Sequence, residues 1–310
     1  MSNQGMDALT VARKYITELE IEYQRKAVKI NRLFTDVMSM GVTGIGEALF
    51  SFGVLEDDFD LPTPYISGNP APVDQLNATQ RQLSARPYNR GFAYSKFKEN
   101  NAIAGTKYVQ TNVERLYDSF YKGYDYSILD AFTGDATQIN SDGKTELISL
   151  PVGNIVAAAG TAFTKAKLLD MINKCGVNEW NTSLKRYILC SETQMGYLLD
   201  DLKMDGDYVA PMKLEEINNE FFGTASMVMF TWRGFWFINT PDSYLDYIST
   251  VPGETTAVLC NEKSIVSHMG MFEMADGAKI NPYDKTIYFG NNYGAVRKYE
   301  KGVFIYQLTK

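Results

Sequence analysis

Apolar residues recur at helical spacing in two long segments of the chain. In residues 6–38 the spacings along the stripe are 4-3-4-4-3-4-3, close to a heptad repeat, and Arg25, Lys26, Lys29 and Arg32 lie beside it. The second stripe consists of Val109, Val113, Leu116, Phe120, Tyr124, Ile128 and Phe132. We predict a long helix over 6–38 and another over 107–133. The first either packs as an arm on another subunit or a scaffold, or folds onto its own domain.

β-Branched and aromatic residues mark the predicted strands, most clearly near the end of the chain. Residues 286–289 and 303–308 predict the two strands of a long β-hairpin, with turns at 290–292 and 300–302. Shorter strands are expected at 185–190 and 230–238.

Helices are predicted after Thr164 and after Ser191, which begins a capping box with Gln194. Gly234 interrupts the apolar run 230–238, which is either one strand or two strands with a kink at that glycine. Because helices and strands are mixed without regular βαβ alternation, the predicted fold class is α+β.

A basic, aromatic segment follows an acidic, proline-rich one. Residues 56–75 contain four prolines, which predict an extended connector, whereas residues 75–98 contain no acid and also carry Tyr88, Phe92 and Tyr94. We expect a long β-hairpin or extended loop over 75–98. Its charge suits nucleic acid, a solvated face, or an acidic patch on another copy of the chain. The candidate inter-subunit residues are Arg81, Arg86, Arg90, Lys96 and Lys98, with Asp57, Asp58 and Asp60 as acidic counterparts.

Charge and composition narrow the classes of function. The net charge of −7 over 310 residues argues against a dedicated nucleic-acid binder. The 20 tyrosines and 17 phenylalanines suit either large subunit contacts or an aromatic core. The cysteines, Cys175, Cys190 and Cys260, are odd in number and far apart, which predicts a reducing compartment without disulfides. We expect neither a secretory signal nor a membrane span.

The residues offer little for catalysis. His268 is the only histidine, so histidine-based nucleophile activation and multi-histidine metal sites are not expected. Gly143-Lys144-Thr145 resembles the end of a phosphate-binding loop, but Gln138 occupies the place of its first glycine, and a hairpin turn over 140–143 is the better interpretation. We therefore predict a protein that is not an enzyme, with no cofactor and no metal.

Six ordered segments carry a resemblance to a known family. They are Lys122–Gly134, Thr164 with Lys167-Leu168, Tyr187–Gln194 with Leu198-Leu199, Asp207-Tyr208, Arg233-Gly234-Phe235 and Gly294-Ala295-Val296-Arg297. Over about residues 75–310 the chain resembles the major capsid proteins of tailed bacteriophages, whose Hong Kong ninety-seven type fold is shared with encapsulins and the herpesvirus capsid floor. It departs from the family pattern at Lys122, often arginine there, and at Glu192, where the family has proline.

The resemblance implies an organisation of the chain into named parts. They are an N-terminal arm (1–74), an extended E-loop (75–106), a peripheral or P-domain with a spine helix at 107–133 (107–149), an axial or A-domain (150–265), and strands that return to the P-domain (266–310).

The function implied by the resemblance is that of a coat protein. Copies would assemble into the hexamers and pentamers of an icosahedral phage head around double-stranded DNA, held without sequence-specific contact. Scaffold, portal and decoration proteins would be further partners, and the virion, assembled in the cytoplasm of a bacterial host, would be its location. The alternatives are an encapsulin-like compartment shell and, from another class, a metal-dependent α+β enzyme that uses acidic residues.

Overall fold

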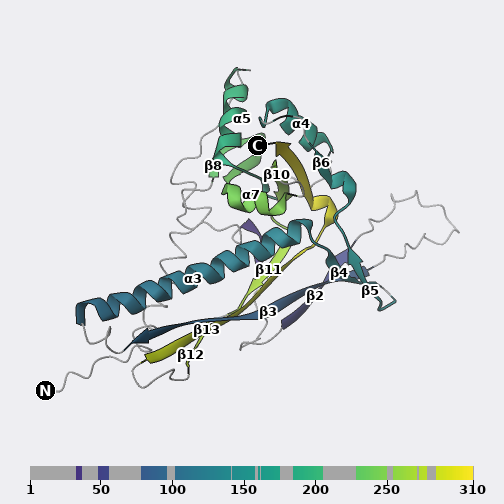
Figure 1. Ribbon diagram of the computed structural model, residues 1–310. Coiled ribbons are helices and arrows are strands. Elements are labelled where there is room, and N and C mark those ends of the chain that lie inside the picture. Colours follow the sequence, from purple (N-terminus) through teal and green to yellow (C-terminus); the bar gives the residue numbers. More distant parts are fainter. Residues whose placement is uncertain are drawn as a thin grey trace.

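Two sheets divide the computed structural model into two modules, which meet at the end of one long helix (Figure 1). The structure describes residues 33–36, 48–55, 78–95, 102–140, 142–157, 160, 162–174, 184–204, 228–249, 254–270, 272–277 and 284–309. Helices and strands both contribute extensively, so the α+β prediction is confirmed.

The first module is an eight-stranded sheet covered by helix α3. The central path of the sheet is β1 (Thr35–Asp36), β11 (Ile265–Met269), β13 (Asp284–Arg297), β3 (Ala78–Ser95), β4 (Ala136–Ile139) and β5 (Thr145–Ile148). In addition, β2 (Ala48–Leu55) pairs with β3, and β12 (Glu273–Asp276) pairs with β13. Helix α3 (Ala102–Thr133) runs along this sheet (Figure 1).

The predicted apolar stripe of α3 is the face that the module buries. Each of its members is at most 7 % exposed, from Val109 at one end to Phe132 at the other. The helix ends at Thr133, as predicted, but it begins at Ala102 and so takes up residues assigned to the E-loop. The helix therefore extends beyond the predicted stripe at its amino end.

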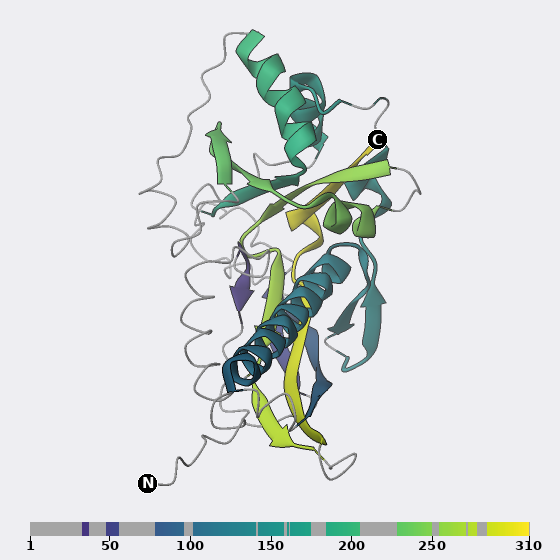
Figure 2. The same cartoon turned by 60° about the vertical axis from the view of Figure 1, so that its left-hand side comes forward.

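The second module is a six-stranded sheet with helices against it. Its strand order is β6 (Ile155–Ala157), β14 (Val303–Thr309), β10 (Glu254–Asn261), β7 (Arg186–Cys190), β9 (Phe235–Asn239) and β8 (Val228–Trp232). The accompanying helices are α4 (Lys165–Lys174), α5 (Glu192–Met204) and α7 (Asp242–Ile248), with the short 3₁₀ helices η2 (Val152–Asn154) and η4 (Glu300–Gly302). Figure 2 shows α5 standing above this sheet, while α3 crosses the other module.

The long C-terminal hairpin predicted from the sequence is wrong. β13 continues through Gly290-Asn291-Asn292 without a turn, because Gly290 pairs with β12 on one side and with β3 on the other. Only the predicted turn at 300–302 forms, as η4. β14 then joins β10 and β6 in the second sheet, so the assignment of all of 266–310 to the first module needs correction.

The predicted N-terminal helix does not reach residue 38. Thr35–Asp36 form β1, which pairs in parallel with Val266–Ser267 of β11. Phe34 is buried between Phe132 and Tyr187, with ring centroids 5.6 and 6.3 Å apart, and this packing overrides the local helical pattern. The rest of the predicted helix lies outside the described residues, as does the connector 56–75.

Local predictions in the second module are mostly confirmed. The strand 186–190, the helices after Thr164 and Ser191 and a break at Gly234 are all present. The Ser191 hydroxyl accepts from the Gln194 N–H at 3.4 Å, and the Gln194 side-chain oxygen accepts from the Phe163 N–H at 2.9 Å. In the first module, the predicted turn at 140–143 joins β4 to β5.

Candidate inter-subunit surface

The candidate arginines lie on β3, which is one continuous strand and neither a hairpin nor a loop. Side chains alternate along it, so Leu83 and Ala85 are buried while Ser84, Arg86 and Tyr88 are exposed. Its partner strands, β2 and β13, come from distant parts of the chain. A segment whose pairing partners are remote gives no local signal of a strand, and this explains the ambiguous prediction.

Arg86 and Arg90 meet the requirement for contact with a neighbour. Both are exposed, and among the described residues no side chain bonds to the Arg86 guanidinium. Arg90 Nη1 donates to Ser119 Oγ of α3 at 3.2 Å. Between them, Tyr88 stacks on Tyr293 of β13 with ring centroids 4.0 Å apart. These side chains form an open cationic and aromatic surface on a rigid strand.

Arg81 requires a correction. It is 1 % exposed, and its Nη2 forms an ion pair with Glu300 Oε1 at 2.7 Å, so it serves the interior of the subunit rather than a contact with a neighbour. The sequence held a signal for this, because Arg81 is in phase with the apolar residues Leu83 and Ala85. Lys96, Lys98, Asp57, Asp58 and Asp60 lie outside the described residues, so their assignment stays a prediction.

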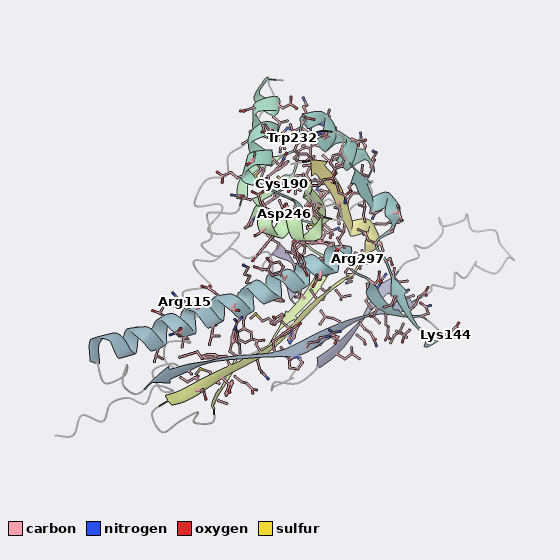
Figure 3. The ribbon with its side chains drawn as sticks, viewed as in Figure 1. Arg115, Lys144, Cys190, Trp232, Asp246 and Arg297 are labelled. Carbon is pink, nitrogen blue, oxygen red and sulfur yellow. The ribbon has the colours of Figure 1, made fainter. Side chains whose placement is uncertain are left out.

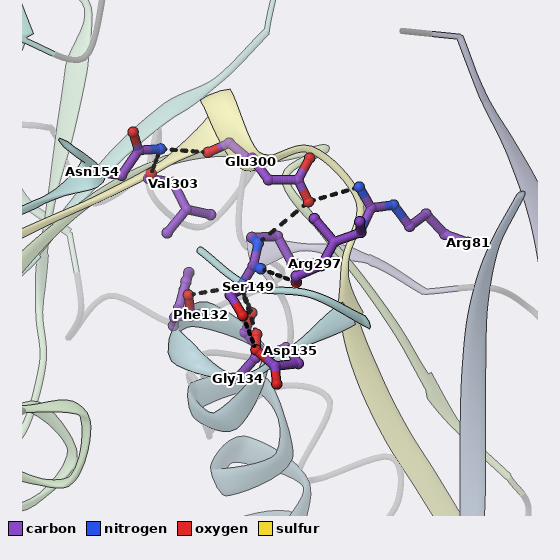
Figure 4. Close-up of polar contacts among 11 residues, drawn as sticks. Arg81, Phe132, Gly134, Asp135, Ser149, Asn154, Arg297, Glu300 and Val303 are labelled. Carbon is purple, nitrogen blue, oxygen red and sulfur yellow. Dashed lines mark hydrogen bonds and ion pairs between the residues drawn. The ribbon is translucent and has the colours of Figure 1, made fainter. Parts of the chain in front are cut away.

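Arg297 belongs to the last of the segments that carry the resemblance, but the sequence did not reveal its structural role. Its Nη1 donates to the carbonyl oxygens of Ala131, Phe132 and Gly134 at 3.3, 3.2 and 2.8 Å, and its Nη2 donates to Ile148 O at 2.9 Å (Figure 4). The last carbonyls of a helix have no partner within it, and Arg297 supplies one. Burial lowers the pKa of Arg297, and the nearby Glu300 carboxylate opposes that shift.

The same cluster joins the two modules. Glu300 lies 3.8 Å from Arg297 Nε, and its backbone carbonyl accepts from Asn154 Nδ2 at 2.8 Å. Asn154 Nδ2 also donates to Val303 O at 3.0 Å, where β14 begins (Figure 4). Figure 3 places Arg297 at the end of α3 nearest the second module, and Arg115 further along the helix. The junction is therefore held by hydrogen bonds to backbone atoms of both modules.

A groove of about 450 Å³ lies beside α3 over the uncovered part of the first sheet. Arg86 and Tyr88 line it from β3, Leu49 from β2 and Asp130 from α3. Leu49 is 62 % exposed, and the Asp130 carboxylate accepts from the Tyr247 hydroxyl at 2.7 Å. The groove mixes apolar and charged groups, which suits a contact with another protein surface better than a small-molecule pocket.

His268, Cys190 and Cys260 are buried, while Cys175 lies outside the described residues. His268 on β11 is 1 % exposed and lies against Phe50, with ring centroids 4.6 Å apart. Cys190 and Cys260 are buried free thiols, and burial raises the pKa of both. Within the described ranges, His, Cys, Asp and Glu side chains do not form a cluster of three or more suited to a metal ion. Among the described helices, none is both long and apolar enough to cross a membrane.

This arrangement, with a long strand and helix in one module and a second sheet reached by the last strand, is the Hong Kong ninety-seven type capsid fold. It is the fold class of tailed-phage capsid proteins and of encapsulins, as the resemblance predicted. Neither a protein-family model nor a curated protein sequence matches the chain.

Solved structures give the similarity in numbers. The capsid of Ralstonia phage GP4 matches with a TM-score of 0.62 at 10 % identity, covering 93 % of this chain and 90 % of that one. The head structure of Helicobacter pylori bacteriophage KHP40 gives 0.59 at 10 % identity, with 89 % of each chain covered. The holo-SrpI encapsulin complex from Synechococcus elongatus gives 0.54 at 12 % identity, covering 100 % of this chain and 92 % of that one. At such identities the likeness establishes the fold.

Proposed function

We propose that this chain is the major capsid protein of a tailed phage, a non-enzymatic subunit that assembles into the hexamers and pentamers of an icosahedral head around double-stranded DNA. The observation that carries the proposal is the fold, which matches phage capsid structures over most of the chain. Scaffold, portal and decoration proteins are the further partners that such a head would use, and assembly would take place in the host cytoplasm.

Within the range 75–106, which we propose as the E-loop, the structure describes β3 and the start of α3. The exposed Arg86 and Arg90 of β3, separated by Tyr88, supply positive charge and a flat aromatic face on a strand that cannot bend easily. Complementary charge fixes the register of an association and speeds it. We infer that this surface docks on an acidic region of a neighbouring copy, and Asp57, Asp58 and Asp60 are the predicted partners.

Reversing the two exposed arginines tests this contact. The variant Arg86→Glu/Arg90→Glu should keep its fold, since both side chains are exposed, but should lose the shells that the wild type forms. Sedimentation velocity and negative-stain microscopy would measure the loss, with circular dichroism as the test of folding. A control variant, Arg115→Glu/Lys144→Glu, makes the same charge change at exposed sites elsewhere and should assemble normally. Particles of normal size from the first variant would defeat the assignment.

An encapsulin-like compartment shell is the second candidate, because the Synechococcus encapsulin matches the full length of the chain. Microscopy of particles from the native source would separate the two. A phage head contains DNA and has one vertex that differs from the others, whereas a compartment shell has equivalent vertices and encloses protein.

A further inference from the structure

Basic side chains gather at one end of the six-stranded sheet. Arg186 at the start of β7 pairs with Phe235 of β9, and Phe235 pairs in turn with Trp232 of β8. On its other side Arg186 pairs with Asn261, where β10 ends. The pairing therefore brings Lys185, Arg186, Arg233 and Lys263 to the same end, which we call the basic sheet end.

The cations at the basic sheet end lie over aromatic rings. Arg186 Cζ is 4.6 Å from the centroid of the Phe235 ring, and Arg233 Cζ is 4.6 Å from that of Trp232. Both rings belong to the core, with exposures of 3 % and 4 %. A guanidinium stacked on a fixed ring loses rotational freedom. Arg233 is exposed, whereas Arg186 is partly buried and its Nε has no hydrogen-bond partner, so both guanidinium groups are held in place with donors left unused.

The turn that carries Arg233 is strained. Arg233 and Gly234 have φ values of 48° and 78°, the positive values that a type I′ hairpin turn requires at both central positions. Glycine and asparagine adopt this conformation readily, while another residue there costs roughly 1–2 kcal/mol. Backbone strain of this kind gathers at binding and switch sites. An arginine kept at such a position points to a role for its side chain.

Three of the four basic side chains, those of Arg186, Arg233 and Lys263, have no acidic partner within the described part of the subunit. No described side chain forms a hydrogen bond or ion pair with the guanidinium of Arg186 or Arg233, or with the ammonium of Lys263. Glu262 is the acid beside them in sequence. Because the net charge of the chain is −7, these unpaired arginines on fixed rings do not reflect a general excess of basic residues.

We propose that the basic sheet end binds carboxylates of a second copy of this chain, in the stretch that begins at Asp200. Residues 200–220 contain seven acids and two lysines. Asp200, at the exposed end of α5, has no partner among the described residues. Arginine forks match carboxylates in geometry as well as charge. Because donor and acceptor surfaces differ, the contact is head-to-tail, the kind that closes into rings. The inference rests on the proposed self-assembly.

Duplex DNA is the competing partner. It is less favoured, because its binding needs basic residues spread over a long footprint, and the overall charge of the chain is negative.

A mixing experiment with complementary charge reversals tests the contact. The first variant is Arg186→Glu/Arg233→Glu, and the second is Asp200→Lys/Asp205→Lys/Asp207→Lys. Asp201 is left unchanged, because its carboxylate accepts from the Lys165 N–H at 2.6 Å. For each variant alone, the assembled fraction measured by mass photometry should be at least tenfold lower than for the wild type, since like charges meet at every contact. Mixed in equal amounts they should recover six-membered rings, because every contact in an alternating ring of six is complementary, whereas a ring of five cannot alternate and closed shells are not expected. The Arg115→Glu/Lys144→Glu variant should assemble as the wild type does.

The outcomes separate this inference from the proposed function. Normal assembly of either variant alone, or no recovery on mixing two variants that melt as the wild type does, would overturn the contact while leaving the shell proposal intact. Normal assembly combined with loss of bound DNA in the arginine variant would assign the basic sheet end to DNA. If Arg186→Glu prevents folding, Arg233→Glu alone replaces it, because that side chain is on an exposed turn. If the wild type never forms more than a monomer, the shell function itself is rejected. The contact can still be tested in that case, because the two variants should form a dimer when mixed, and a mixture that stays monomeric would overturn the contact as well.

Discussion

At the scale of single residues, one guanidinium completes the carboxyl end of α3. Arg297 donates to four carbonyl oxygens from the end of the helix and from β5, and it is fully buried. A buried cation is stable only when its donors are satisfied, and buried carbonyls also lose free energy without donors. Arg297 and its acceptors therefore depend on each other.

The variant Arg297→Met should lower the free energy of unfolding by about 3–5 kcal/mol, because the carbonyls and Glu300 lose their partner while the apolar volume is largely kept. Urea unfolding measures this change. Arg115→Met, at an exposed position of the same helix, should cost under about 0.5 kcal/mol. A loss for Arg297→Met as small as that of the control would show that water replaces the guanidinium.

Two tyrosines make stability depend on pH in the alkaline range. The hydrogen bond to the Asp130 carboxylate, with burial and the charge of Asp130, raises the pKa of Tyr247 to about 12. Burial, with the charge of Tyr88, raises the pKa of Tyr293 to about 12. Tyrosine in an unfolded chain ionises near pH 10. The unfolded state therefore loses these protons first, so the stabilisation present below pH 10 decreases as the pH rises toward 12.

Denaturant unfolding at pH 9 and at pH 11.5 should show a lower free energy of unfolding at the higher pH. The double variant Tyr247→Phe/Tyr293→Phe should show a smaller decrease, because neither side chain can ionise. An equal decrease in the variant would assign the pH dependence to other groups.

At the scale of elements, the close approach of β13 to β3 depends on Gly294. A Cβ at this position would collide with the carbonyl oxygen of Ser84 and lie 3.1 Å from Ala85 Cα, both backbone atoms that cannot turn away. The strand pairing His268↔Gly294 continues to β11, so a shift there would disturb three strands.

Gly294→Ala should therefore destabilise the protein by roughly 1–3 kcal/mol, the usual cost of overpacking. Gly196→Ala is the matched control, since Gly196 is exposed on α5 with open space where the Cβ would be. The control should stabilise the protein by about 0.5–1 kcal/mol. Thermal melts of the two variants should move in opposite directions, and a shift in the same direction would contradict the account.

The sequence predicted elements whose pattern is local and failed where pairing is distant. The stripe of α3, the short strands of the second module and the β4–β5 turn follow from spacing and turn residues, and they formed as predicted. β13 continues through Asn291 and Asn292 because β3 pairs with it there without a break, and the partner strand lies about 200 residues earlier in the sequence, where no local pattern can reveal it. That β13 and β14 belong to different sheets could not be predicted for the same reason.

The residues of the candidate site show the same difference between local patterns, which were predictable, and distant contacts, which were not. Arg86 and Arg90 were predictable, because a basic segment without acids tends to be exposed. The roles of Arg81 and Arg297 depend on Glu300 and on the end of α3, which approach them only in the folded chain. The basic sheet end was likewise hidden, since Arg186 and Arg233 become neighbours only through the pairing of β7 with β9.

At the scale of the whole molecule, one hydrophobic core extends through the junction of the modules. It includes Phe132 of α3, Leu245 of α7 and Ile305 of β14. A shared core favours unfolding in one step over separate unfolding of each module.

Cys190 and Cys260 offer a test of this cooperativity, because both thiols are buried in the second sheet and burial raises the pKa of each. Pulsed alkylation with mass spectrometry should find them protected in the native protein. Their exposure should follow the same urea midpoint as the loss of helical circular dichroism, to which α3 contributes most among the described helices. Earlier alkylation would show that the second module opens alone.

The reach of Arg297 back to the end of α3 has a consequence for synthesis. The donor lies more than 160 positions after the carbonyls of Ala131, Phe132 and Gly134 that it satisfies. A growing polypeptide on the ribosome can form the helix early but receives its terminal donor only when translation is nearly finished. The carbonyl groups at the end of α3 therefore stay without this donor until nearly the whole sequence has been translated.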